Sequence, residues 1–153
     1  MLHFPFPVYP QIRREFIPNR RLFYRYYPLS SPMAIEGKKL AIACAQAAEE
    51  IQAEDIRVID LTGLSSLTDF MVVCSGTSLP HLRAVMRDVE KKLIEEYNVR
   101  PVNAEGNADS RWVVLDFIDV MVHIMHHEMR DLYALEDLWA GGKDVVWQEN
   151  TPE

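Results

Sequence analysis

Acidic and histidine side chains gather between residues 112 and 128, and they are the groups in this chain best suited to chemistry. Asp116 and Asp119 could hold Mg²⁺, because carboxylate oxygens are among its preferred protein ligands. The turn Ser75-Gly76-Thr77-Ser78 follows a predicted strand and precedes a predicted helix, a layout that can present backbone N–H groups to a phosphate. One hypothesis is therefore phosphoryl chemistry with Mg²⁺ on the two aspartates.

Two features weigh against that hypothesis. The turn has one glycine and no lysine, so it is neither a Walker loop nor a dinucleotide fingerprint. The two aspartates flank a link instead of alternating along one strand, and no basic residue is near them to receive a triphosphate. A nucleotidyltransferase-like enzyme, in which a Gly-Ser turn precedes Mg²⁺-binding carboxylates, is therefore kept as the alternative. We favour a protein that is not an enzyme.

The histidines and cysteines do not have the spacing of a metal site. On a strand, His123 and His127 would point the same way and His126 the opposite way, and the helical HExxH spacing is absent. Cys44 and Cys74 lie far apart, in a predicted helix and a predicted strand, which favours buried thiols over a disulfide or a zinc site. We expect no metal and no cofactor.

The stretch around the aspartates predicts a β-hairpin. Two apolar runs, at residues 112–115 and 120–125, flank the link Asp116-Phe117-Ile118-Asp119. In the register that we expect, Asp116 lies opposite Asp119, and side chains alternate between two faces. The core face then carries four branched aliphatic residues: Val113, Leu115, Val120 and Val122. The other face carries Trp112, Val114, Asp116, Asp119, Met121 and His123.

The second face has the composition of a protein-binding surface. An exposed tryptophan beside apolar residues and a few carboxylates is typical of an aromatic anchor with a polar rim. The carboxylates would favour a basic partner and repel nucleic acid. The alternative is that Trp112 is an ordinary core residue. A register change of one residue would exchange the two faces, and Phe117-Ile118 suits a tight turn poorly because such turns favour Gly, Asn or Asp.

The elements that must position this hairpin can be followed along the chain. Apolar residues at helical spacing predict helices at 34–53, 78–97 and 130–139. Short apolar runs bounded by turn residues predict strands at 56–61, 70–75 and 100–104 in addition to the hairpin. This order combines a helix crossover with a hairpin, which predicts an α/β fold with a mixed sheet of about five strands and helices packed on it.

Composition divides the chain into an arm, a domain and a tail. Residues 1–32 hold five Arg and one Glu, for +4, so the net charge of −7 leaves −11 on residues 33–153. We expect one domain at residues 33–142 and a C-terminal tail at 143–153. An acidic domain is not expected to bind a phosphate backbone directly. No apolar run approaches the roughly 20 residues that a membrane span needs, so we expect no membrane crossing.

The arm holds six of the nine prolines and eight of the twelve Phe and Tyr residues, without helical or strand periodicity. We interpret it as disordered or as the product of a start codon assigned too far upstream. Its basic, acid-poor character also allows an organelle transit peptide, although such peptides are usually Ser-rich and amphipathic. Contact with RNA is a further possibility.

Several separated motifs resemble the ribosomal silencing factor family, also called the Iojap or RsfS family. They are DLTGLSSLTDF, VVCSGTS, EGNADSRWVVLDFIDVMVHIM and RDLYALEDLW, in the family's order and spacing between about Glu36 and Trp139. The resemblance implies a fold related to nucleotidyltransferases but without their activity. It also implies binding to the fourteenth protein of the large (50S) ribosomal subunit, which blocks joining of the small subunit and represses translation.

Carried onto this chain, the family's partner surface would include Trp112 and Asp116. Ser65, Ser66 and Asp69 match the family's Gly-Leu-Ser-Ser…Asp motif, and they either contribute to function or shape a turn and a strand entry. The resemblance allows a homodimer. It implies a bacterial cytoplasmic protein or, if the arm is a transit peptide, one of a plastid or mitochondrion. The family usually has Gly where this chain has Ile118, and the arm has no counterpart in the family core.

Overall fold

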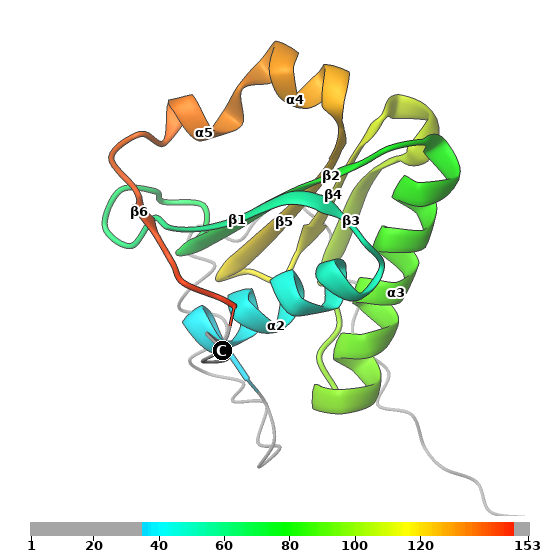
Figure 1. Ribbon diagram of the computed structural model, residues 1–153. Helices are drawn as coiled ribbons and strands as arrows, with labels where there is room; N and C mark the ends of the chain where they lie inside the picture. The colour runs from blue at the N-terminus through cyan, green and yellow to red at the C-terminus, as the bar shows by residue number, and fades with distance from the viewer. Residues whose placement is uncertain (1–34, 149–153) are drawn as a thin grey trace, which may run out of the picture. The chain divides into compact units, whose positions relative to one another are not determined.

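The sheet is mixed and has six strands in the order β3-β4-β5-β2-β1-β6 (Figure 1). The computed structural model describes residues 35–148. Only β2 and β5 pair in parallel; every other neighbouring pair is antiparallel. The strands are β1 (Glu54–Asp60), β2 (Phe70–Gly76), β3 (Asn103–Asn107), β4 (Trp112–Asp116), β5 (Val120–His126) and β6 (Lys143–Asp144). The helices are α2 (Gly37–Glu50), α3 (Leu79–Tyr97), α4 (His127–Tyr133) and α5 (Leu135–Leu138), with a 3-10 turn, η1 (Ala108–Ser110).

The α/β class and the mixed sheet are confirmed, but the expected number of about five strands is wrong. The sixth strand, β6, has two residues and pairs with the edge of β1. A strand this short has no periodicity from which it could be predicted. The expected tail at 143–153 therefore begins inside the sheet, and Trp147 packs against the core beyond it. The arm at residues 1–32 lies outside the described residues, and within them no helix is both long and apolar enough to cross a bilayer.

The two faces of the sheet are covered unequally. Helices α2 and α3 pack on one face over a large apolar cluster that includes Val58, Val72 and Ile124 (Figure 1). The opposite face carries a smaller cluster of five buried residues, covered by the segment that contains α4 and α5. Every residue of β2 is buried, so this strand is covered on both sides. All of the binding candidates except Asp119 lie on the less covered face.

The hairpin of β4 and β5 forms two residues out of the predicted register. Asp116 pairs with Met121 instead of Asp119, and Trp112 pairs with Met125 instead of His123. A shift of two residues keeps each side chain on its own face, because side chains alternate with a period of two. The predicted division into a core face and an open face therefore survives the error. Val113, Leu115, Val120 and Val122 are all completely buried.

The tight turn explains the shift. The loop contains Ile118 and Asp119, and the Phe117 N–H donates to the Val120 carbonyl at 2.9 Å. Ile118 has φ +84°, which is unusual for a β-branched residue. Asp116 compensates because its Oδ1 accepts from the Ile118 N–H at 2.8 Å. The expected register, with Asp116 opposite Asp119, placed the centre of the turn at Phe117-Ile118, one residue too early.

Asp119 does not lie on the open face, and that prediction is wrong. Its carboxylate accepts from the backbone N–H of Gly37, the first residue of α2, while Glu36, which occupies the N-cap position, makes no side-chain capping bond. Its carbonyl accepts from the N–H groups of Asp69 and Phe70 at 3.0 and 2.9 Å. Burial raises the pKa of Asp119, although the Gly37 hydrogen bond acts in the opposite direction. The turn thus connects β5, β2 and α2.

The other predicted elements are confirmed with shifted ends. Helix α3 begins where Ser78 caps it, since the Ser78 Oγ accepts from the His81 N–H at 3.2 Å. The strand expected at 100–104 lies at Asn103–Asn107. The helix expected at 130–139 is two short helices, interrupted at Ala134 with φ +42°. Cys44 and Cys74 are free and buried, as expected.

We predict that Gly106→Ala lowers the free energy of unfolding by about 2 kcal/mol. Gly106 has φ +77°, and an added Cβ would lie 2.2 Å from the Trp112 carbonyl oxygen. Gly63→Ala is the matched control, because Gly63 has φ +81° but nothing within 4 Å of the added atom. It should cost about 1 kcal/mol in urea denaturation. Equal losses would mean that the clash at Gly106 is relieved by movement of the hairpin.

Asp119→Ala should lower the free energy of unfolding by about 1 kcal/mol, the usual cost of a lost N-terminal cap. The reason is that its carboxylate accepts from Gly37 at the start of α2. Glu36→Ala serves as the control, since Glu36 makes no side-chain capping bond there. Thermal or urea denaturation should show a change within about 0.5 kcal/mol for the control. An equal effect of both substitutions would contradict capping by Asp119.

Candidate binding surface

Trp112 is half-buried at the start of β4 and lies among aromatic neighbours. Its indole Nε1–H donates to Nδ1 of His123 at 3.2 Å. Its ring centroid lies 5.0 Å from that of Tyr133, tilted by 47°. It also packs against the smaller core cluster on this face. Trp112 is therefore both a packing residue and a partly exposed one, which neither sequence hypothesis anticipated.

The neighbouring positions of the open face are also half-buried. Val114 pairs with His123 across the hairpin, and Met121 pairs with Asp116. The side chains of Val114, Met121 and His123 all retain partial exposure. Together with Trp112, these three residues define the hairpin surface. The structure brings together four of the six predicted binding residues in this surface.

His123 is held as a neutral imidazole. Because its Nδ1 accepts the indole N–H, the proton of the neutral ring is on Nε2. Burial lowers its pKa to about 4. The hairpin surface therefore presents an aromatic and aliphatic set at neutral pH, without a cation at its centre.

The two aspartates do not form a metal site. Asp116 is only 4% exposed and closes the turn, whereas Asp119 is bonded at the start of α2. Among residues 35–148 no group of three or more His, Cys, Asp or Glu side chains is arranged to hold a metal ion. The geometry gives no support to the alternative in which both carboxylates bind Mg²⁺.

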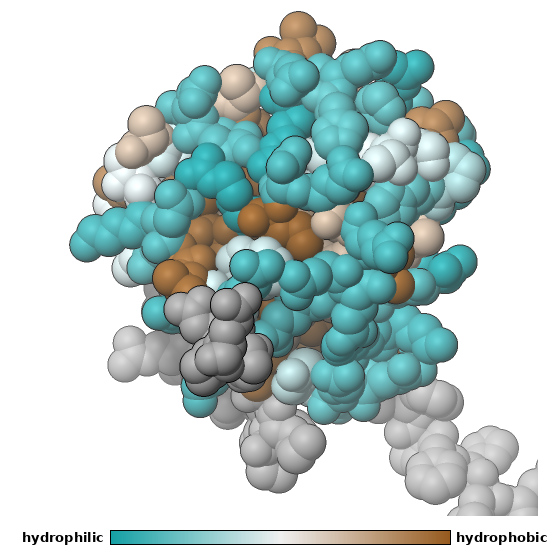
Figure 2. All heavy atoms as spheres, viewed as in Figure 1, coloured by the Kyte–Doolittle hydropathy of each residue, from teal (hydrophilic) through white to brown (hydrophobic). Residues whose placement is uncertain are grey.

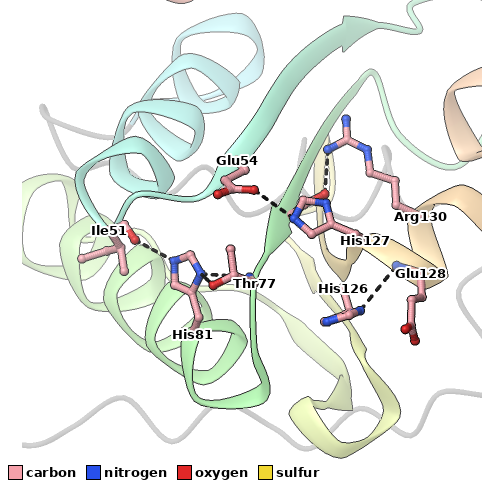
Figure 3. A network of polar contacts seen from close by, with 9 residues as sticks. Ile51, Glu54, Thr77, His81, His126, His127, Glu128 and Arg130 are labelled. Atoms are coloured by element: carbon pink, nitrogen blue, oxygen red, sulfur yellow. Dashed lines mark hydrogen bonds and ion pairs between the residues drawn. The ribbon is translucent and has the colours of Figure 1, made fainter.

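In the turn from Ser75 to Ser78, which could have bound a phosphate, polar groups are hydrogen-bonded to other parts of the protein. The Thr77 N–H donates to Nδ1 of His81 at 3.1 Å, and Nε2 of the same ring lies 2.8 Å from the Ile51 carbonyl (Figure 3). The Ser75 Oγ accepts from Nη1 of Arg130 at 2.9 Å. Internal hydrogen bonds therefore join this loop to α3 and α4, and through His81 to Ile51 at the end of α2.

The histidines at the junction of β5 and α4 have different hydrogen-bond partners, although their rings lie 6.1 Å apart. His127 Nε2 lies 2.9 Å from a carboxylate oxygen of Glu54 on β1. His126 Nδ1 accepts from the Glu128 N–H at 3.4 Å, at the start of α4 (Figure 3). These contacts point the two rings at different partners, because the chain changes from strand to helix between them. His123 instead contacts Trp112.

The motif residues of uncertain role shape the loop between β1 and β2. The Ser65 Oγ accepts from the N–H groups of Leu67 and Thr68 at 3.1 and 3.4 Å. The Asp69 carbonyl accepts from the Leu61 N–H at 2.7 Å. Ser66 is exposed. These contacts give Ser65 and Asp69 structural roles in the loop.

Arg130 is the residue of this region that sequence patterns did not single out. Its guanidinium bonds Ser75 on β2 and forms an ion pair with Glu136 on α5, with a closest distance of 2.6 Å. Both side chains are largely buried. The only signal in the sequence is an Arg and a Glu six positions apart in RDLYALEDLW. That spacing matches no regular helical pair, so the contact depends on the break between α4 and α5.

His123 should make the protein less stable in mild acid. Its pKa is near 4 in the folded state and about 6.5 in the unfolded state, so between these values only the unfolded chain binds the proton. The free energy of unfolding should therefore fall by about 2 kcal/mol from pH 7 to pH 5 on account of this group. His123→Gln can still accept the indole N–H but cannot titrate. Urea denaturation at both pH values should show a smaller fall in the variant, and identical pH dependence would contradict the assignment.

The chain matches known proteins over most of its length. The family model described as "ribosomal silencing factor during starvation" (RsfS) matches residues 34–153. The ribosomal silencing factor RsfS of Chromobacterium violaceum is 40% identical over 108 residues, which are 71% of this chain and 85% of that protein. The mouse "mitochondrial assembly of ribosomal large subunit protein 1" is 36% identical over 89 residues, 57% of this chain and 39% of that protein.

A solved structure agrees with both the fold and the sequence match. A crystal structure of a Chromobacterium violaceum protein superposes with a TM-score of 0.66 at 33% identity, covering 77% of this chain and 98% of that one. The family match extends well beyond half of the chain. The resemblance that the separated motifs indicated is thereby confirmed, and the chain belongs to the ribosomal silencing factor family.

Proposed function

We propose that this protein represses translation by binding the large ribosomal subunit through its fourteenth ribosomal protein and blocking the approach of the small subunit. The family supports a regulatory role at the ribosome. The name of the mouse relative refers to the large subunit. Steric blocking needs an interface of about 1,200–2,000 Å² and no reaction, so this proposal requires no catalytic group.

The observation that carries the proposal is the hairpin surface around Trp112. Its indole is fixed by His123 and Tyr133 and remains partly exposed, which is the arrangement of a preorganised aromatic anchor. Asp116 supports this surface by holding the turn, and Asp119 supports it from the start of α2. The acidic charge of residues 33–153 favours a basic protein partner over RNA.

The setting proposed is the bacterial cytoplasm, in keeping with the bacterial relatives. A mitochondrial or plastid protein is the alternative, and the mouse relative belongs to the mitochondrial class by its name. A homodimer is compatible with the proposal, since only the hairpin surface of one copy is needed for docking.

The full-length protein should be recovered with purified bacterial 50S subunits and not with 30S subunits, and adding it should reduce formation of 70S particles in a sucrose gradient. Trp112→Ala should weaken 50S binding by at least about 30-fold, equivalent to about 2 kcal/mol. Trp147→Ala is the control, because Trp147 is also half-buried but packs against the core on the other side of the sheet.

The control should lower the melting temperature and leave affinity unchanged. Loss of stability without loss of affinity in Trp112→Ala would show that Trp112 is only a core residue. Absence of 50S binding by the wild-type protein would overturn the proposed function.

A further inference from the structure

We propose that Met121 is an oxidation-sensitive site of the hairpin surface, at which conversion of the thioether to the sulfoxide by a peroxide weakens docking on the large ribosomal subunit. This inference rests on the proposed function and adds a means of regulating it. It is carried by three observations: the gathering of methionines on one face of the sheet, the partial exposure of Met121 beside Asp116, and the burial of both cysteines.

Methionines are concentrated on the open face of the sheet. Five of the chain's seven methionines lie within residues 35–148, and three of these, Met71, Met125 and Met129, belong to the smaller core cluster or pack against it. Met121 lies on the same face, because it pairs with Met71 between β5 and β2. The fifth, Met86 on α3, packs against the larger cluster. The residue type that peroxides oxidise most readily after the thiolate is thus gathered on the face that carries the hairpin surface.

Met121 is accessible to a small oxidant in the free protein. Its side chain is half-buried, whereas Met71 and Met125 are 2% and 0% exposed. Figure 2 shows apolar atoms reaching the surface at the level of β1, between α2 and the α4–α5 segment, so the cover of the sheet is incomplete in this view. Because a peroxide must contact the sulfur in order to react, Met121 should be oxidised well before its two buried neighbours.

The two cysteines of the chain do not compete with the methionines for a peroxide. Cys44 and Cys74 are free and completely buried. Burial raises the pKa of Cys44, and it raises the pKa of Cys74 to about 12, so both thiols stay protonated at neutral pH. Since the thiolate is the form of cysteine that a peroxide oxidises, the accessible thioethers should react first.

The reaction transfers one oxygen atom from hydrogen peroxide to Met121. The sulfur lone pair attacks one peroxide oxygen, the S–O bond forms as the O–O bond breaks, and the departing hydroxide takes the proton of the transferred oxygen and leaves as water. The thioether is oxidised to the sulfoxide and the peroxide is reduced. Methionine sulfoxide reductase reverses the change with electrons from a thiol, so the modification can act as a switch.

A sulfoxide at this position opposes docking in two ways. It places a polar oxygen in the aromatic and aliphatic hairpin surface, where a partner would have to remove its water. It also adds a partly negative oxygen beside Asp116, which pairs with Met121 across the hairpin and is only 4% exposed. Side chains that lie directly opposite on antiparallel strands are close enough to interact, so the oxygen and the carboxylate should repel each other.

The test measures 50S binding by the full-length protein before and after treatment with hydrogen peroxide, with peptide mass spectrometry to quantify the sulfoxide at each methionine. Oxidation of Met121 should weaken wild-type binding by about tenfold or more, and methionine sulfoxide reductase with dithiothreitol should restore it. Each variant is compared only with itself, as the ratio of its affinities before and after treatment. The ratio should stay below about twofold for Met121→Leu, which has no sulfur at this position.

Met86→Leu is the matched control, because Met86 is also half-buried but packs on the other face of the sheet. It should lose affinity on oxidation as the wild type does, and so should Met129→Leu. Bound 50S subunits should protect Met121 from peroxide and leave Met86 as reactive as in the free protein.

The outcomes separate this inference from the proposed function. If untreated wild-type protein binds 50S but oxidation leaves its affinity unchanged, or Met121→Leu loses affinity as the wild type does, Met121 is not a regulatory site and the proposed function stands. Loss of the circular dichroism spectrum on oxidation would also overturn the inference, because unfolding would then explain the loss. If untreated protein does not bind 50S, both fall. A reversible loss of binding by a folded protein, shown by Met86→Leu and absent in Met121→Leu, would support the inference.

Discussion

Burial of strand β2 on both faces is the constraint on which the rest of this structure depends. All of its residues are buried, and it pairs in parallel with β5 at the centre of the sheet. One face is covered by two long amphipathic helices, whose packing needs only apolar periodicity. The other face is covered by two short helices that lack buried residues of their own. This second cover combines packing of Met129, Leu135 and Trp139 on the smaller cluster with the polar contacts of Arg130.

Two carboxylates, Asp119 and Glu136, hold helices in place by polar contacts in addition to apolar packing. Asp119 accepts a hydrogen bond at the start of α2, and Glu136 pairs with Arg130 between α5 and the sheet. Hydrogen bonding and the nearby guanidinium keep the pKa of Glu136 low despite the opposing effect of burial. The Asp119 contact joins residues 82 positions apart, and the Arg130–Glu136 pair is tied to the sheet by the bond from Arg130 to Ser75, 55 positions away. Both acidic side chains thus act as structural connections.

The unequal cover of the two sheet faces explains why Trp112 in the proposed docking surface is only partly buried. A full helical layer would bury the tryptophan, and an uncovered face would expose the apolar residues of the smaller cluster to water. The partial cover leaves Trp112 packed on one side and accessible on the other. Its neighbours His123 and Tyr133 restrict the indole, so binding would require little rearrangement.

Amino-acid order alone determined the α/β class, the long helices, the central strands and the division of the hairpin into two faces. These follow from local periodicity, which survives even a two-residue error in register. Separated motifs also determined the family. Only the tertiary structure decided that Asp119 caps α2, that Ile118 adopts φ +84°, and that β6 closes the sheet edge. It also decided the contact of Arg130 with Ser75. The cap on α2, the pairing of β6 and the Arg130 contact join groups far apart in the chain, for which no local pattern exists. The conformation of Ile118 is local, but it is one that a β-branched residue rarely adopts.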